Sequence, residues 1–237
     1  IYTWLLNSLC LTKSKFVSNS ANTDGGAIHA AIRERMLIFQ CLFQNNHAGK
    51  TAGVLYLSCT VYLRIPLIIQ KSKFDSNSAD HAGVMFISGD IAFKNIQSNF
   101  TNNSAKYQGA VIFVEIGLSF MNVKCQFVKN YLSVPSQIIS DLMGRNKENG
   151  AAICIEKISN FVDHGSVYLY NFAQDHGGVL AYTNTKTVFI INAIFAHNKA
   201  LVGGGVIHGA NKLNILINNG SIFVNNTSAY GGALYIS

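Results

Sequence analysis

The sequence repeats one phrase, Phe16-Val-Ser-Asn19-Ser-Ala21-Asn-Thr-Asp-Gly25-Gly26-Ala27-Ile28, along almost its whole length. In this phrase an aromatic residue is followed three positions later by asparagine and, after a short polar segment, by Gly-Gly-Ala-Ile. The aromatic residue occurs at Phe16, Phe43, Phe74, Phe100, Phe127, Tyr168, Phe195 and Phe223. The asparagine accompanies each of them, at Asn19, Asn46, Asn77, Asn103, Asn130, Asn171, Asn198 and Asn226. The chain is therefore a repeat array.

The spacing of the aromatic residues indicates the class of repeat. Successive intervals are 27, 31, 26, 27, 41, 27 and 28 residues, which is the range of solenoids, propellers and similar arrays. Short runs rich in Val, Ile, Leu, Phe and Tyr, such as Val54–Leu57 and Leu67–Ile69, lie after the glycines and before the aromatic residue. Such runs are typical of β-strands, and no stretch keeps the 3.6-residue period of an amphipathic helix.

We therefore predict an all-β fold, a parallel β-helix of about eight coils with roughly 27 residues in each coil. A leucine-rich repeat is the alternative architecture, because it has a similar length and an asparagine ladder. Its signature L-x-x-L-x-L-x-x-N is absent from this chain.

In a β-helix, each repeated position becomes a column of residues at the ~4.8 Å spacing of parallel strands. The eight asparagines predict a ladder in which each side-chain amide bonds to the neighbouring asparagines and to the bent backbone. The eight aromatic residues predict a stack of rings inside the coil, and the glycines predict positions with positive φ or without room for a Cβ atom. These columns are the predicted structural sites, and we predict no catalytic, cofactor-binding or metal-binding residue.

The composition agrees with a solenoid. Hydrophobic residues make up 49% of the chain and charged residues only 12%, compared with about 25% charged residues in an average soluble domain. One motif covers nearly everything, so we expect residues 1–237 to form a single β-helix domain. Neither end carries a polar cap, so we also expect a fragment of a longer repeat protein. Residues 131–149 fall in the longest interval and are predicted to be an inserted loop, with Ile138–Met143 as one helical turn.

Charge and hydropathy limit the classes of partner. The net charge is +7, from 18 basic and 11 acidic residues, but the basic residues are scattered rather than grouped in a stripe with exposed aromatic residues. We therefore expect no nucleic-acid partner. We also expect no membrane span in this segment, because no run reaches the roughly 18 apolar residues that a spanning helix needs.

Acidic residues and histidines are the candidates for chemistry. Parallel β-helices also include polysaccharide lyases and glycoside hydrolases, which need clustered acids. The densest titratable group here is Asp163, His164, Asp175 and His176, for which we expect a turn-forming, solvated role. His29 and His208 occupy the same slot of the repeat but lie six coils apart, ~29 Å at one strand spacing per coil, so they do not share a metal ion.

The chain has five cysteines, at Cys10, Cys41, Cys59, Cys125 and Cys154. No C-x-x-C motif occurs, which argues against a zinc site. Two of the cysteines share a slot three coils apart, ~14 Å, which is too far for a disulfide. We expect small buried hydrophobic side chains, with one bridge allowed.

The paired phrases G-G-A-[ILV] and F-x-x-N resemble the repeat of the chlamydial polymorphic outer-membrane proteins. The glycine phrase is assigned at Gly25–Ile28, Ala52–Leu55, Ala82–Met85, Gln108–Val111, Asn149–Ala152, Gly177–Leu180, Gly204–Ile207 and Gly231–Leu234. The resemblance implies a right-handed parallel β-helix outside the cell or on its surface, on the outer membrane if the source is bacterial. It also implies the type of β-helix that serves as the exposed part of an adhesin.

Three functions follow as hypotheses. The first is a non-enzymatic, cell-surface or secreted, adhesin-like or structural β-helix segment, with a cell-surface receptor or a glycan as the candidate partner and no cofactor. The second is a carbohydrate-active enzyme, a polysaccharide lyase or glycoside hydrolase, which requires carboxylates that converge in a lateral groove. The third is a purely structural spacer.

Overall fold

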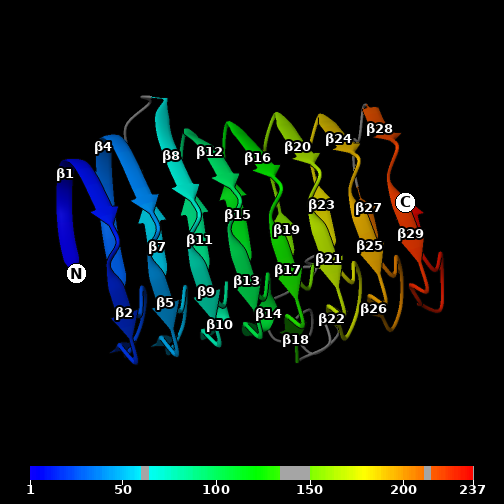
Figure 1. The fold of residues 1–237 in the computed structure, drawn as a ribbon, viewed down its shortest axis with the longest axis horizontal. Helices are drawn as coiled ribbons and strands as arrows, with labels where there is room; N and C mark the ends of the chain where they lie inside the picture. Colours follow the sequence, from blue (N-terminus) through cyan, green and yellow to red (C-terminus); the bar gives the residue numbers. More distant parts are fainter. Residues whose placement is uncertain (60–63, 134–149, 211–214, 237) are drawn as a thin grey trace.

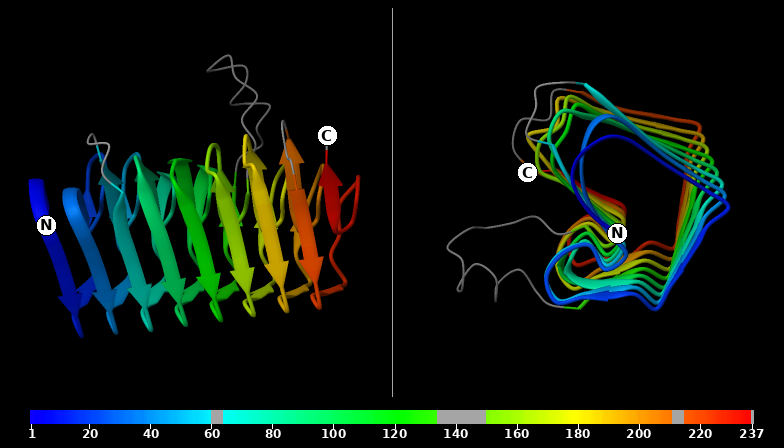
Figure 2. Two further views of the ribbon diagram at one scale, coloured as in Figure 1. Left: turned by 90° about the horizontal axis from the view of Figure 1, so that it is seen from above. Right: turned by 90° about the vertical axis from the view of Figure 1, so that its left-hand side faces the viewer.

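The computed structural model describes residues 1–59, 64–133, 150–210 and 215–236 and shows a parallel β-helix of stacked coils (Figure 1). Neighbouring coils pair through parallel strands. The chain winds clockwise as it recedes from its N-terminal end, which makes the helix right-handed (Figure 2). The predicted all-β, right-handed parallel β-helix of about eight coils is thus confirmed, with coils spaced by roughly 27 residues.

Each coil contributes strands at up to four positions. The glycine-side sheet follows the glycine phrase and contains β7 (Leu55–Ser58), β11 (Met85–Ser88), β15 (Ile112–Ile116), β19 (Ile153–Ile155), β23 (Leu180–Thr183), β27 (Ile207–Ala210) and β30 (Leu234–Ile236). The middle sheet contains β8 (Ile65–Gln70), β12 (Ile91–Ile96), β16 (Ser119–Val123), β20 (Asn160–His164), β24 (Thr187–Ile191) and β28 (Ile215–Asn219). The long strands β1 (Tyr2–Thr12) and β4 (Ile28–Phe39) join these two sheets at the N-terminal end.

The other two strand positions are short. The aromatic sheet contains β2 (Lys15–Val17), β5 (Leu42–Gln44), β9 (Lys73–Asp75), β13 (Asn99–Thr101), β17 (Gln126–Val128), β21 (Val167–Leu169), β25 (Ile194–Ala196) and β29 (Ile222–Val224). The short-strand sheet contains β3 (Ser20–Ala21), β6 (His47–Ala48), β10 (Ser78–His81), β14 (Ser104–Gln108), β18 (Tyr131–Leu132), β22 (Phe172–Ala173) and β26 (Lys199–Ala200).

Left-handed residues turn the chain on both sides of each aromatic strand. The residues before these strands with positive φ are Lys13, Gln40, Lys71, Gln97, Lys124, Gly165, Asn192 and Gly220. The residues after them are Ser18, Asn45, Ser76, Asn102, Lys129, Tyr170, His197 and Asn225. Because left-handed backbone is costly for residues other than glycine, these corners need support from neighbouring hydrogen bonds, and each corner of the second set directly precedes a ladder asparagine.

The interior of the coils is a continuous apolar core. Strand β8 shows the alternation, because Ile65, Leu67 and Ile69 are buried whereas Pro66 is exposed. One cluster of buried side chains extends along the helix axis through all the coils. The fully buried Tyr182 pairs across the coils with Gly209, where an added Cβ atom would overlap the Tyr182 ring.

Two details of the predicted register are wrong. The structure pairs Ile112 with Ile153, so the glycine phrases of these coils are Gly109-Ala-Val-Ile and Gly150-Ala-Ala-Ile. Each begins one residue after the assigned Gln108 and Asn149. Gly109 has a φ of 53°, like Gly25 at 67° in the first coil. The phrases were assigned one residue too early because alanine occupies the second glycine position in both of them.

The predicted insertion at 131–149 starts too early, because its first two residues form strand β18. Tyr131 pairs with Ser104 on one side and with Phe172 on the other, so the ladder continues across the longest interval. The predicted helical turn at Ile138–Met143 and the rest of the predicted loop, residues 134–149, lie outside the described residues.

Candidate functional site

The ladder asparagines form a continuous hydrogen-bonded column along the β-helix. Around Asn103, the backbone N–H of Asn77 and its side-chain Nδ2 both donate to Oδ1 of Asn103, at 2.9 and 3.0 Å. Asn103 in turn donates from its backbone N–H and its Nδ2 to Oδ1 of Asn130, at 3.0 and 3.1 Å, and from Nδ2 to the carbonyl of Phe74 at 3.1 Å. The same pattern joins all eight asparagines, Asn19, Asn46, Asn77, Asn103, Asn130, Asn171, Asn198 and Asn226.

The eight aromatic side chains, Phe16, Phe43, Phe74, Phe100, Phe127, Tyr168, Phe195 and Phe223, stack in one column inside the coils. Ring centroids of neighbours are 4.7 to 4.9 Å apart, and the rings are nearly parallel. This spacing equals the strand repeat, so the same register that aligns the asparagines also aligns the rings.

A second, shorter polar column lies at the corner before the aromatic strands. The backbone N–H of Cys41 donates to Oγ of Ser72 at 3.1 Å, and that of Ser72 donates to Oγ of Ser98 at 3.2 Å. The backbone N–H of Cys125 donates to Oγ of Ser166 at 3.1 Å. Cys41 and Cys125 therefore replace serine in a hydroxyl column.

No disulfide joins the five cysteines, all of which lie among the described residues. Cys41, Cys125 and Cys154 are buried, as expected for small hydrophobic side chains, and burial raises the pKa of the Cys125 thiol to about 12. Cys10 is exposed and Cys59 is partly buried, so the expectation of burial is wrong for Cys10. Cys10 pairs with Leu37, which lies in the outward phase of β4, so strand alternation turns the Cys10 side chain to the surface.

The expected solvated role is wrong for Asp163. This residue lies on β20 with 1% exposure, because strand alternation turns its side chain into the core. The hydroxyl of Tyr168 donates to Oδ2 of Asp163 at 2.5 Å, and the backbone N–H of Ser166 donates to Oδ1 at 3.2 Å. His164, the next residue along, is exposed.

Two further side chains extend this buried polar chain along the axis. Nδ2 of Asn122 donates to the Tyr168 hydroxyl at 3.1 Å, and Nδ2 of Asn95 donates to Oδ1 of Asn122 at 3.1 Å. Burial raises the pKa of Asp163 to about 6, and the hydrogen bonds from Tyr168 and Ser166 oppose this rise. The sequence analysis did not predict this network. Strand alternation in the middle sheet nevertheless turns the side chains of Asn95, Asn122 and Asp163 into the core.

Asp175 and His176 lie in the turn before the glycines rather than with Asp163. Nδ1 of His176 is 2.7 Å from Oδ1 of Asp175, whose side chain is also buried, contrary to expectation. The ring of His176 lies 4.2 Å from that of His208. His29 occupies the same column as His208, but it stacks on Tyr56 at 4.6 Å, at the other end of the β-helix. Within the described residues, no group of three His, Cys, Asp or Glu side chains could hold a metal ion.

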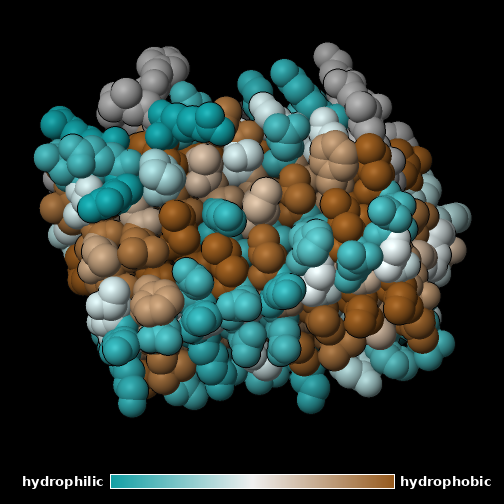
Figure 3. Space-filling model, turned by 45° about the horizontal axis from the view of Figure 1, so that its top comes forward, coloured by the Kyte–Doolittle hydropathy of each residue, from teal (hydrophilic) through white to brown (hydrophobic). Residues whose placement is uncertain are grey.

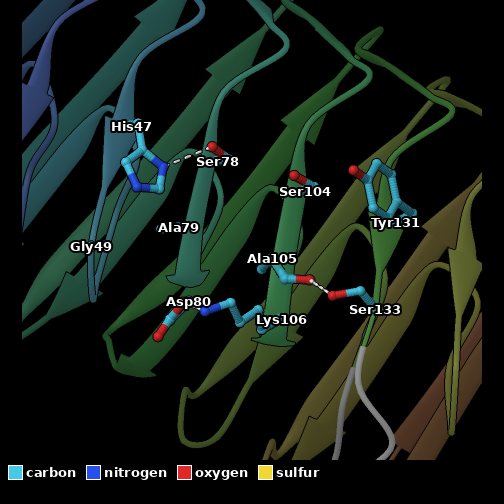
Figure 4. A pocket seen from close by; sticks show the side chains of 10 residues that line it. All are labelled: His47, Gly49, Ser78, Ala79, Asp80, Ser104, Ala105, Lys106, Tyr131 and Ser133. Atoms are coloured by element: carbon cyan, nitrogen blue, oxygen red, sulfur yellow. Dashed lines mark hydrogen bonds and ion pairs between the residues drawn. The ribbon is translucent and has the colours of Figure 1, made fainter.

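A lateral groove crosses the short-strand sheet (Figure 4). It has a volume of about 350 Å³. Four coils, those of β6, β10, β14 and β18, supply its residues, which include His47, Ser78, Ser104 and Tyr131 in successive coils. Two residues further along the chain, Asp80 and Lys106 form an ion pair across neighbouring coils, with Nζ 2.6 Å from Oδ1.

The outer face of the middle sheet carries a column of partly exposed apolar side chains that the exposed Lys94 interrupts. The apolar members of this column are Leu37, Ile68, Met121, Val162 and Phe189. Figure 3 shows apolar side chains gathered in several places on this side of the molecule. Two shallow grooves of about 250 and 260 Å³ lie on this face. Among the described residues, no helix has the length and apolarity of a membrane-spanning segment.

The comparisons with known proteins agree with this geometry. Residues 13–31 match the family model of the Chlamydia polymorphic membrane protein repeat. Neither a curated protein nor a solved structure gives a significant match. The matched segment contains Phe16, Asn19 and the first glycine phrase, and the other seven copies of this pattern stack on it in register. The chain is therefore a parallel β-helix in which one segment, residues 13–31, is similar to the Chlamydia polymorphic membrane protein repeat.

Proposed function

We propose that the chain is a non-enzymatic, adhesin-like rod displayed on a cell surface or secreted, and that it binds through its lateral faces. The observation that carries this proposal is the match of residues 13–31 to the Chlamydia polymorphic membrane protein repeat, together with the continuation of the same residue pattern through eight coils. On a bacterial cell the expected location is the outer membrane. A receptor or a glycan on a neighbouring cell is the proposed class of partner.

The fold supports a binding role because its side chains divide into two sets. The inward columns of asparagine, serine and aromatic residues fix the coils, whereas the outward residues differ from coil to coil. Substitution at the surface therefore leaves the ladder intact, and different coils present different side chains on a rigid scaffold. The exposed positions of the short-strand sheet, where His47, Ser78, Ser104 and Tyr131 share one column, are an example.

A combined binding and turnover assay tests this proposal. The full chain, fluorescently labelled, is applied to cultured cells and to immobilised glycans, and the release of polysaccharide fragments is measured in the same wells. Saturable binding without fragment release is the expected result. Fragment release would replace the proposal with the lyase or hydrolase hypothesis, and the absence of both signals would leave the spacer as the better description.

A further inference from the structure

The lateral groove on the short-strand sheet has the form of a trough with a ring at each end. His47 on β6 and Tyr131 on β18 belong to the same column and are separated by the two small side chains Ser78 and Ser104. Three coil spacings separate the two rings, so the trough is ~14 Å long. The buried Ala79 and Ala105 lie behind its floor.

The groups that face the trough can both donate and accept hydrogen bonds. Ser78 and Ser104 supply hydroxyl groups, as does Ser133 near the far end. Nδ1 of His47 lies 3.0 Å from Oγ of Ser78, which holds the imidazole at the end of the trough (Figure 4). Asp80 adds an acceptor and Lys106 adds donors at the opposite margin.

The charges of the trough compensate one another. The Lys106 ammonium is 2.6 Å from the Asp80 carboxylate, so this margin offers polar contacts without a net charge. Tyr131 adds an aromatic face that is 46% exposed. A ligand that complements this surface carries many hydroxyl groups, has no net charge and has an apolar face that can lie on a tyrosine ring. These are the properties of a sugar ring.

We propose that this groove binds a neutral oligosaccharide that lies across the coils, with one sugar ring stacked on Tyr131 and its hydroxyl groups bonded to Ser78, Ser104 and the Asp80–Lys106 pair. This assignment rests on the proposed adhesin function and names its ligand class and its site. The open, shallow shape suits an extended chain rather than a compact small molecule. The Asp80–Lys106 pair disfavours sulfated or carboxylated glycans, because an anionic ligand has to compete with Asp80 for Lys106.

The test measures binding of the full chain to short neutral glucan, mannan and galactan oligosaccharides, with sulfated heparin oligosaccharides as the anionic comparison. Tyr131→Ala removes the stacking face, and Ser104→Tyr fills the trough with a ring that the adjacent column position already accommodates. Tyr131→Phe keeps the ring and removes only the hydroxyl. Tyr230→Ala is the matched control, because Tyr230 is 63% exposed and lies in the last coil.

We expect Tyr131→Ala and Ser104→Tyr to weaken binding of a neutral oligosaccharide by about tenfold or more, the change that corresponds to loss of one aromatic contact. Tyr131→Phe and Tyr230→Ala should bind like the parent. Each variant should unfold at the same temperature as the parent, which would show that its fold is intact. The assignment would be overturned if Tyr131→Ala and Ser104→Tyr bound neutral oligosaccharides as tightly as the parent does. It would also be overturned if the parent bound heparin oligosaccharides more tightly than neutral ones.

Cell binding of the same variants separates this inference from the proposed function. If the parent binds cells but no neutral oligosaccharide, the groove assignment is wrong and the adhesin proposal stands. If the parent binds a neutral oligosaccharide through Tyr131 but does not bind cells, the groove assignment stands and the adhesin proposal is wrong.

Discussion

Replacement of one internal ladder asparagine should weaken the β-helix in a way that the hydrogen bonds predict. Asn103→Ala removes four bonds: the two that Oδ1 of Asn103 accepts from Asn77, and the two that Nδ2 of Asn103 donates to Asn130 and Phe74. At about 1 kcal/mol for each bond, the expected loss in the free energy of unfolding is roughly 3–4 kcal/mol. The backbone bond from residue 103 to Asn130 remains.

Hydrogen exchange at individual amides is the sharper assay, because long repeat arrays do not always unfold in a single step. In Asn103→Ala, the backbone amide of Asn77 loses its acceptor and should exchange much faster than in the parent, whereas the amide of residue 103 keeps its acceptor and should change less. Asn22→Ala is the control, because Asn22 is exposed and outside the ladder. Equal losses of stability in the two variants, or unchanged protection of the Asn77 amide, would refute this reasoning.

Three other predictions test separate parts of the interior. Burial raises the pKa of Asp163 from 3.8 to about 6, so the stability contributed by the protonated side chain is present below about pH 4 and is lost as the pH rises through 6. Urea unfolding should therefore show that the parent loses about 3 kcal/mol relative to Asp163→Asn across this pH range. Parallel pH profiles of the two proteins would contradict this prediction. Tyr182→Phe should leave stability unchanged or raise it by about 1 kcal/mol, because the buried Tyr182 hydroxyl has no hydrogen-bond partner among the described residues. Tyr168→Phe should cost about 1.5–3 kcal/mol through loss of its bond to Asp163. A loss of stability in both variants, measured in the same unfolding assay, would count against this distinction. Gly83→Ala should cost about 1–3 kcal/mol or more of stability in thermal unfolding, because its Cβ atom would overlap the backbone oxygens of Ala110 and Ser104. Gly117→Ala should cost less, because its Cβ atom meets only side chains of Val114 and Ile158, which can shift. Equal costs would show that the packing does not require glycine at position 83.

The architecture could be predicted because the same physical demand recurs in every coil. One asparagine of a globular protein says little, but eight asparagines, each three residues after an aromatic residue, require a common environment. The strand count was harder to predict. A strand of three residues such as Lys73–Asp75 is too short to show alternation, so the aromatic and short-strand sheets could not be separated from turns in the sequence.

The features that occur in only a few coils were missed or misassigned. Asn95, Asn122 and Asp163 form the buried polar chain in three successive coils, where other coils have apolar residues such as Ile69 and Ile190. A polar residue at an inward strand position was the available signal. Asp163 was instead grouped with the neighbouring titratable residues His164, Asp175 and His176, and the group was predicted to lie in a solvated turn.

The groove depended on information that the sequence does not carry directly. His47 and Tyr131 are far apart in the chain. They lie in one column of the same surface only because β6, β10, β14 and β18 are stacked in register. Tyr131 was assigned to the inserted loop because it falls in the longest interval between the repeated aromatic residues. The pairing of Tyr131 with Ser104 places it instead at the end of the trough.

The stacked register is tested most directly by measuring scalar couplings across the ladder hydrogen bonds by NMR. The backbone nitrogen of each ladder asparagine from Asn19 to Asn198 should couple to the side-chain carbonyl carbon of the asparagine in the next coil, for example from Asn77 to Asn103. Seven such links should join the eight asparagines from Asn19 to Asn226. Couplings from these amides to carbonyl carbons within their own coil would contradict the stacked register on which the fold, the groove and the proposed function depend.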